Sequence, residues 1–140
     1  MNRHHITGAL GCLSILYVLY VVAGLRWNFS PSMPIGLWRV THEQVHRGSI
    51  VALYEVMKEV AGLPGDSVSF TRAGVYINGQ LWPDSAPIGA NHYPFGSMVL
   101  QPGQYLLMGR NKLSWDARYN GWTTTTIIAS TARPVWVKSR

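Results

Sequence analysis

A lysine inside an apolar stretch is the first residue of this sequence that could do chemistry. Lys58 lies in the run 50–60, whose β-branched and aromatic residues predict a single strand. Since side chains alternate along a strand, Lys58 is expected to share a face with the uncharged residues Ile50, Ala52, Tyr54, Val56 and Val60. Burial on such a face lowers the pKa of a lysine, which makes a neutral amine available as a base. The alternative is an edge lysine whose ammonium reaches water.

Two serines held between prolines are the second candidate. Residues 28–36 read Asn-Phe-Ser-Pro-Ser-Met-Pro-Ile-Gly, so that Ser30 and Ser32 lie on restricted backbone. A nucleophilic serine needs a fixed hydroxyl and a nearby base. Ser-Pro-Ser is also a common loop sequence, and the pattern alone leaves both interpretations open.

Two further stretches combine turn residues with charges. Residues 58–66 end in Pro-Gly-Asp, which favours a type II turn before Asp66. Residues 109–119 contain Ser114, Asp116 and Arg118, of which the last two are spaced to form an ion pair. A structural role is the default for such a pair.

The N-terminal part predicts a membrane anchor. Residues 6–25 are twenty residues without a charge, long enough to cross a bilayer as a helix. A cleavable signal peptide has a shorter apolar core and a small-residue cleavage site. We therefore expect a short N-terminus at 1–5, a retained transmembrane helix at 6–25 and one domain at 26–140. Basic residues lie on both sides of the span, so charge does not fix its orientation.

Composition narrows the class of protein. The 140 residues suit one domain, and eleven of the twelve Lys and Arg residues follow the predicted span, against six Asp and Glu. Such a basic surface suits anionic lipid headgroups. No recognised nucleic-acid motif accompanies it, so nucleic acid is not expected as a partner. The only cysteine, Cys12, excludes an intrachain disulfide.

The rest of the sequence predicts a mainly β fold. Short apolar runs alternate with Gly, Pro and Asn turns, and no long amphipathic helix is visible. Residues 83–98, rich in proline and glycine, predict a surface excursion. The predicted strands are 48–60, 68–71, 75–77, 80–82, 105–108, 123–129 and 134–137.

In this order, the three stretches resemble the serine–lysine signal peptidases. That family has a Ser-Met-x-Pro-like box after the membrane helix, then a Lys-Arg-x-x-Gly-x-Pro-Gly-Asp box, then a Gly-Asp-Asn…Ser-x-Asp-Ser-Arg box. The resemblance covers residues 28–136. It implies that Ser32 is the nucleophile and Lys58 the base. In the third box, Ser114, Asp116 and Arg118 would support them.

Within the family, the boxes resemble those of TraF-type conjugative transfer peptidases. Their nucleophile box reads Ser-x-Pro-x-Gly with an aromatic residue two places later, and residues 32–38 read Ser-Met-Pro-Ile-Gly-Leu-Trp. General signal peptidases usually place the proline one residue later, and many carry a large additional β domain. Three departures stand out. Glu59 replaces the usual arginine, Arg110-Asn111 stands where Asp-Asn is common, and Ala117 replaces a serine.

The resemblance also implies a mechanism and a setting. The Ser32 N–H and the Ser30 hydroxyl would form the oxyanion hole, and no cofactor is needed. The substrate would be a membrane-tethered precursor at the bilayer surface: a propilin, or, for a general type I signal peptidase, a signal-peptide-bearing protein. The catalytic domain would lie on the periplasmic side of the bacterial inner membrane. The resemblance leaves two outcomes open for the acyl-enzyme: hydrolysis by water, or transfer to the pilin's own amine, which would cyclise the pilin.

Two alternatives compete with this interpretation. Residues 42–46 read His-Glu-Gln-Val-His, the zinc-protease pattern, with Glu55 and Glu59 as possible third ligands. That chemistry needs both histidines on one helix face, and the segment is too short for such a helix. A non-enzymatic membrane module of a pilus or secretion complex would explain the anchor and the basic surface. It would not explain a lysine on an apolar strand face.

Overall fold

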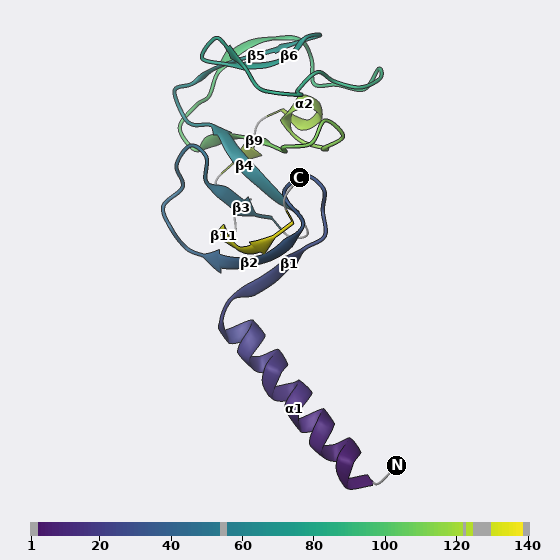
Figure 1. Cartoon of the computed structure of the whole chain (residues 1–140). Coiled ribbons are helices and arrows are strands. Elements are labelled where there is room, and N and C mark those ends of the chain that lie inside the picture. Colours follow the sequence, from purple (N-terminus) through teal and green to yellow (C-terminus); the bar gives the residue numbers. More distant parts are fainter. Residues whose placement is uncertain (1–2, 54–55, 122, 125–129, 139–140) are drawn as a thin grey trace.

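A long helix precedes a β domain in the computed structural model, which describes residues 3–53, 56–121, 123–124 and 130–138. The helix α1 (Arg3–Val22) projects away from the domain, with the sheet that contains β1 nearest to it (Figure 1). Within the described ranges, no helix is both long enough and apolar enough to cross a bilayer. The anchor predicted over 6–25 is therefore not shown.

The domain consists of two antiparallel sheets. In spatial order the larger contains β1 (Leu25–Asn28), β2 (Gly36–Thr41), β11 (Ser130–Val137), β3 (Ile50–Ala52), β4 (Met57–Gly62), β9 (Gln104–Met108) and β10 (Thr123–Thr124). The smaller contains β7 (Gln80–Leu81), β6 (Gly74–Ile77), β5 (Ser67–Thr71) and β8 (Gly96–Val99). The short helix α2 (Ala117–Asn120) lies with β5 and β6 at the end of the domain away from α1 (Figure 1). A mainly β fold was expected and is confirmed.

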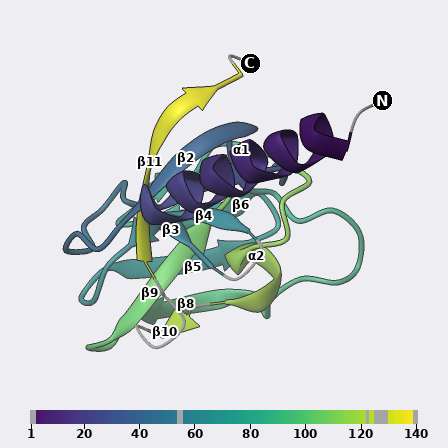
Figure 2. The same cartoon turned by 90° about the horizontal axis from the view of Figure 1, so that it is seen from below.

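The last strand of the chain lies inside the larger sheet. β11 pairs with β2 on one side and with β3 on the other, and Figure 2 shows it beside both. The β1–β2 hairpin and the β3–β4 hairpin are therefore joined through the C-terminal strand. Apolar side chains from these strands and from Met33, in the loop between β1 and β2, form one buried cluster: Met33, Trp38, Ala52, Met57 and Ala132.

Several predicted elements are confirmed. The 68–71 and 75–77 strands form a hairpin as β5 and β6, and Asn78-Gly79, with φ of 51° and 80°, forms the turn to β7. The 105–108 strand is β9. The 134–137 strand is the end of the longer β11, and of the 123–129 strand only Thr123–Thr124 falls within the described residues.

The single strand predicted over 48–60 is wrong. The chain turns back after Ala52, where the Leu53 N–H donates to the Val56 carbonyl at 2.9 Å, and β3 and β4 pair as a hairpin. In this register Lys58 lies opposite Val51. Lys58 therefore does not share a face with Ile50 and Ala52. Tyr54 lies outside the described residues. Apolar β-branched residues on both sides of the turn resemble one continuous strand in sequence.

The strands β1, β2 and β8 also differ from the prediction. The surface excursion over 83–98 ends earlier, because residues 96–98 belong to β8, which pairs with β5. β1 and β2, which flank the nucleophile box, were not expected. Their hairpin aligns Asn28 with Gly36 and so closes the loop that carries both candidate serines.

A buried aspartate joins the turns at one end of the domain. Asp66 accepts hydrogen bonds from the Leu63 N–H at 2.6 Å, from Asn78 Nδ2 at 2.7 Å and from Arg47 Nη2 at 2.7 Å. Burial acts to raise the pKa of Asp66, but these hydrogen bonds and the charge of Arg47 outweigh it and lower the pKa below its usual value. The carboxylate thus stabilises the fold in its ionised form.

We expect Asp66→Asn to lower the free energy of unfolding by about 1–3 kcal/mol at neutral pH, because it weakens hydrogen bonds to a charged acceptor. A lowered folded-state pKa contributes stability above the unfolded pKa of about 3.9, and this contribution is lost as pH falls below it. The difference from the wild type should therefore shrink in acid. Thermal unfolding of the full chain in detergent, followed by circular dichroism across this range, tests it. Asp84→Asn, at an exposed aspartate, is the control; a deficit equal at pH 3 and pH 7 would contradict the assignment.

Candidate active site

The loop between β1 and β2 is organised by Asn28. This buried side chain donates from Nδ2 to the carbonyls of Ser30, Met33 and Pro34, at 3.0, 3.2 and 3.1 Å, and its Oδ1 accepts from the Ser30 N–H. One amide thus contacts the loop on both sides of Ser32 and fixes its path. Sequence reasoning missed this role, although Asn28 opens the nucleophile box.

Three side chains from separate parts of the chain meet beside this loop. Lys58 Nζ donates to Ser32 Oγ at 2.9 Å and to Ser114 Oγ at 2.6 Å, and Ser114 Oγ lies 3.0 Å from Ser32 Oγ. All three residues are at least 94 % buried. The structure therefore brings together the predicted nucleophile, the predicted base and one predicted supporting residue; we call these three the Ser–Lys–Ser cluster.

Burial controls the charge of the lysine. Desolvation is the largest effect on Lys58 and lowers its pKa, the Asp116 carboxylate acts in the opposite direction, and the Arg118 guanidinium lowers the pKa further. The net result is a pKa below the usual lysine value. A neutral amine next to a serine hydroxyl can accept the proton of that hydroxyl.

Asp116 and Arg118 form a buried ion pair that fixes the segment carrying Ser114. Arg118 Nε donates to Asp116 Oδ1 at 2.8 Å, and both side chains are almost fully buried. Asp116 also accepts from the Gly109 N–H at 2.8 Å, and Arg118 Nη1 donates to the carbonyls of Asp84 and Lys112. Each buried charge is thus paired and hydrogen-bonded, as burial requires.

Gly109 makes room for Ser114. A Cβ built on Gly109 would overlap Ser114 Oγ and lie 3.3 Å from Asp116 Oδ2. The next residue, Arg110, donates its backbone N–H to the Ser32 carbonyl at 2.7 Å. Residues 109 and 110 therefore join the nucleophile loop to the Ser114 segment. Neither role was predicted; the only signal in the sequence is the glycine that opens the third box.

The two predicted oxyanion donors lie next to each other. The Ser32 N–H points at Ser30 Oγ, at 3.4 Å. This is a long hydrogen bond, and it places a backbone donor and a hydroxyl donor on the same side of the nucleophile loop. A substrate carbonyl oxygen can take the place of this weak internal contact.

The zinc-protease pattern does not adopt the helix that its chemistry needs. Residues 42–46 form an extended loop, Glu43 pairs with Arg133 at 2.8 Å, and His46 Nδ1 contacts the Arg47 carbonyl. Glu59 pairs with an arginine, and Glu55 lies outside the described residues. Among the residues that the structure describes, no three His, Cys, Asp or Glu side chains are grouped to hold a metal ion. The histidines therefore belong to a surface loop.

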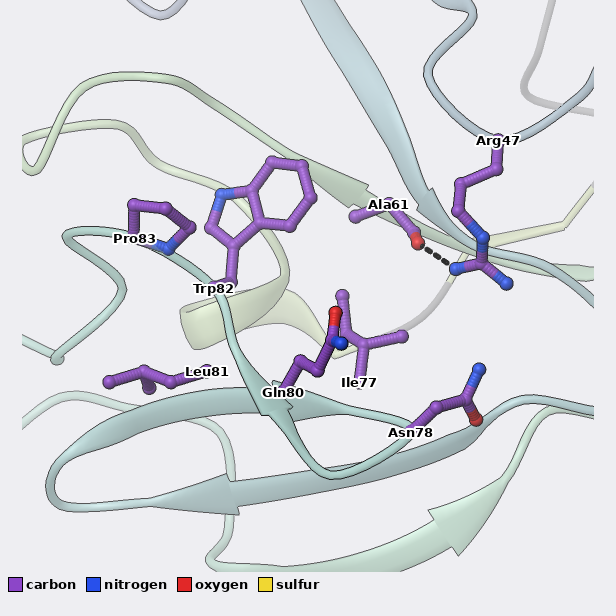
Figure 3. A pocket seen from close by; sticks show the side chains of 8 residues that line it. All are labelled: Arg47, Ala61, Ile77, Asn78, Gln80, Leu81, Trp82 and Pro83. Carbon is purple, nitrogen blue, oxygen red and sulfur yellow. Dashed lines mark hydrogen bonds between the residues drawn. The ribbon is translucent and has the colours of Figure 1, made fainter.

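Two cavities of the domain have linings that do not include Ser32, Lys58 or Ser114. One, of about 520 Å³, is bounded by Arg47 and Ala61 on one side and by Ile77, Asn78 and residues 80–83 on the other (Figure 3). The second, of about 480 Å³, is lined by Glu59, Trp82, Pro83, Asp84 and Arg110. An extended polypeptide substrate binds across a surface and needs no enclosed cavity at the cut.

An antiparallel β domain with a buried serine–lysine contact has the architecture and chemical groups of the peptidases that the three boxes resemble. The family model described as "Signal peptidase, peptidase S26" matches residues 4–137, and the chain belongs to this family.

Relatives place the chain among TraF proteins. It is 30 % identical to the conjugal transfer protein TraF of Agrobacterium tumefaciens (strain 15955), over 94 % of this chain and 93 % of that protein. It is 29 % identical to a plasmid transfer protein TraF of Escherichia coli, over 81 % and 84 %. The predicted TraF-like resemblance is confirmed. A solved signal peptidase I of Enterococcus faecalis V583 overlaps with 65 % of this chain and 98 % of that one, at a TM-score of 0.46 and 20 % identity, too low to add to the argument.

We expect Gly109→Ala to reduce peptidase activity at least about a hundredfold, because the new methyl group displaces Ser114 from the lysine amine. Cleavage of a quenched peptide with an Ala-x-Ala sequence before the cut measures the effect. Gly11→Ala is the matched control, since apart from the adjacent backbone of its own helix no atom lies within 4 Å of a Cβ at that position. Full activity of Gly109→Ala would show that Ser114 does not position the base.

We also expect kcat/KM to rise with pH through an apparent pKa below the ordinary lysine value of about 10.4, because only the neutral amine acts as a base. Val51→Thr places a hydroxyl opposite Lys58, eases the desolvation that lowers its pKa and should move this limb to higher pH. Val68→Thr, equally buried in the other sheet, should leave the limb in place. A limb that did not move in Val51→Thr would mean that burial does not set the pKa of the base.

Proposed function

We propose that this chain is a membrane-anchored serine endopeptidase with a Ser32–Lys58 dyad, which cleaves membrane-tethered precursor proteins. The observation that carries the proposal is the buried contact of Lys58 Nζ with Ser32 Oγ at 2.9 Å. A fully buried lysine is rare unless something compensates, and perturbed titratable groups gather at functional sites. Membership of the signal peptidase family supports the same chemistry.

The reaction would proceed through an acyl-enzyme. Neutral Lys58 takes the proton of Ser32 Oγ, and the oxygen attacks the scissile carbonyl carbon. The oxyanion of the tetrahedral intermediate accepts hydrogen bonds from the Ser32 N–H and from the Ser30 hydroxyl. As the C–N bond breaks, the Lys58 ammonium gives its proton to the leaving amine. Lys58 then deprotonates a water molecule, which hydrolyses the ester on Ser32.

The remaining residues hold this pair in place. Ser114 contacts both reacting side chains and orients the amine toward Ser32. Asp116 and Arg118 pair with each other and fix the segment that carries Ser114, since Asp116 accepts from the Gly109 N–H and Arg118 donates to the Lys112 carbonyl. The reacting atoms of a dyad must lie within about 3–3.5 Å of each other, and these contacts keep Lys58 and Ser32 at such a distance.

The substrate would be presented at a lipid surface. The side chains of Leu10 to Val22 in α1 are mostly exposed and apolar, which supports a transmembrane anchor within the predicted span 6–25 that ends with α1 at Val22, since Leu25 already belongs to β1. The following domain would then lie at the bilayer surface. Exposed aromatic residues lie beside the nucleophile loop: Trp27 has its ring centroid 6.1 Å from that of Phe29 and 5.9 Å from that of Trp136. Tryptophan at such a position suits the membrane–water interface. We place the domain on the periplasmic side of a bacterial inner membrane.

The precursor that fits best is a propilin of a conjugative transfer system. Two TraF relatives are named for conjugal or plasmid transfer. The proline spacing of residues 32–36 also fits the TraF-type resemblance. The second candidate is a general type I signal peptidase acting on signal-peptide-bearing proteins, which the family description favours. Coexpression with each kind of precursor separates them. Mass spectrometry of the processed pilin then distinguishes hydrolysis from cyclisation by the mass of one water molecule.

We expect Ser32→Ala and Lys58→Met each to abolish precursor processing while the protein still accumulates in the membrane. Methionine keeps the apolar stem of lysine without the amine. The losses should not add in the double variant, because either member of the dyad is inactive alone. Ser69→Ala, at a half-buried serine in the other sheet, and Lys112→Met, at an exposed lysine, are matched controls that should process normally. Substantial processing by Ser32→Ala or by Lys58→Met would exclude the dyad.

A further inference from the structure

We propose that the ion pair between Glu59 and Arg110 is a positioning element that aligns the Ser–Lys–Ser cluster. The inference rests on the proposed function, since it assigns a role in the same reaction. Neither residue touches the reacting atoms in the structure, and both act through their neighbours.

The pair lies where the segments carrying the cluster meet. Arg110 Nε donates to Glu59 Oε2 at 2.6 Å. Glu59 directly follows Lys58 in β4, and the Arg110 backbone N–H binds the Ser32 carbonyl at 2.7 Å. Arg110 also follows Gly109, the residue against which Ser114 packs. One side-chain contact thus ties the strand of the base to the loop of the nucleophile and to the segment of Ser114.

The two side chains carry opposite charges and contact each other directly. Reversing either charge alone would place like charges together at this spacing, which is unfavourable. Reversing both keeps the attraction. What the site requires is therefore the pairing of opposite charges rather than a given sign at either position.

The expected effect is on rate rather than on stability. The side chains are 51 % and 13 % exposed for Arg110 and Glu59, and ion pairs at a protein surface add little to the free energy of folding. Small displacements of reacting groups, in contrast, reduce rates strongly. Neither residue is among the causes that shift the pKa of Lys58, so the pH dependence of the reaction should stay in place.

The test is a charge-exchange cycle on the full chain in detergent micelles, with the quenched Ala-x-Ala peptide as the probe. Glu59→Gln and Arg110→Gln keep the backbone N–H that binds Ser32, and each should lower kcat about tenfold with little change in KM, in the pH limb or in Tm. Glu59→Arg alone should be worse than Glu59→Gln. The double variant Glu59→Arg with Arg110→Glu should recover kcat to within about threefold of the wild type.

A second ion pair serves as the matched control. Glu43 and Arg133 lie 2.8 Å apart on the surface, with side chains 43 % and 70 % exposed, and Glu43→Gln should leave kcat unchanged. A double variant no more active than Glu59→Arg would overturn the inference, as would single variants that change only KM or only Tm. If these results came with an inactive Ser32→Ala, the dyad would stand and only the positioning role would fall. An active Ser32→Ala would instead remove the proposed function.

Discussion

The exclusion of water from the amine of Lys58 is the constraint on which the rest of the site depends. A hydrated lysine at neutral pH is a cation with no lone pair for a proton, whereas a desolvated lysine can be neutral. Among the described contacts, the Lys58 amine binds two hydroxyl groups and no carboxylate. A carboxylate in contact would favour the ammonium form and oppose the effect of burial.

The buried pair of Asp116 and Arg118 follows from the same constraint. Asp116 is needed to hold the Gly109 N–H and the Ser114 segment, but its charge raises the pKa of Lys58. Arg118 lies against Asp116 and acts in the opposite direction. The pair therefore supplies hydrogen bonding next to the base, while the charge of Arg118 opposes the effect that the Asp116 carboxylate has on the pKa of Lys58.

Residue chemistry raised Lys58 and Ser32 as candidates, the family resemblance assigned their roles, and tertiary contacts determine the rest of the site. An apolar run around Lys58 and a proline-bounded loop around Ser32 are local patterns, and the structure places both side chains together. The placement of Ser114, Asp116 and Arg118 came from the resemblance of the third box. The strand assignment over 48–60 failed because the hairpin register is set by pairing with β9 and β11, far away in sequence. Asn28, Gly109 and the Glu59–Arg110 contact escaped prediction because their roles exist only once distant segments meet.

The position of β11 has a consequence for the order in which the larger sheet is assembled during synthesis. Ser32 follows β1 and Lys58 lies in β4, and β11, from near the C-terminal end of the described chain, separates the two hairpins in the sheet. A nascent chain that already contains both residues but not β11 still lacks the strand that pairs with β2 and with β3. The sheet that joins the two hairpins then forms only by long-range pairing, which is a slow class of contact to form. Until β11 is added, Ser32 and Lys58 belong to two hairpins that no strand of the sheet connects.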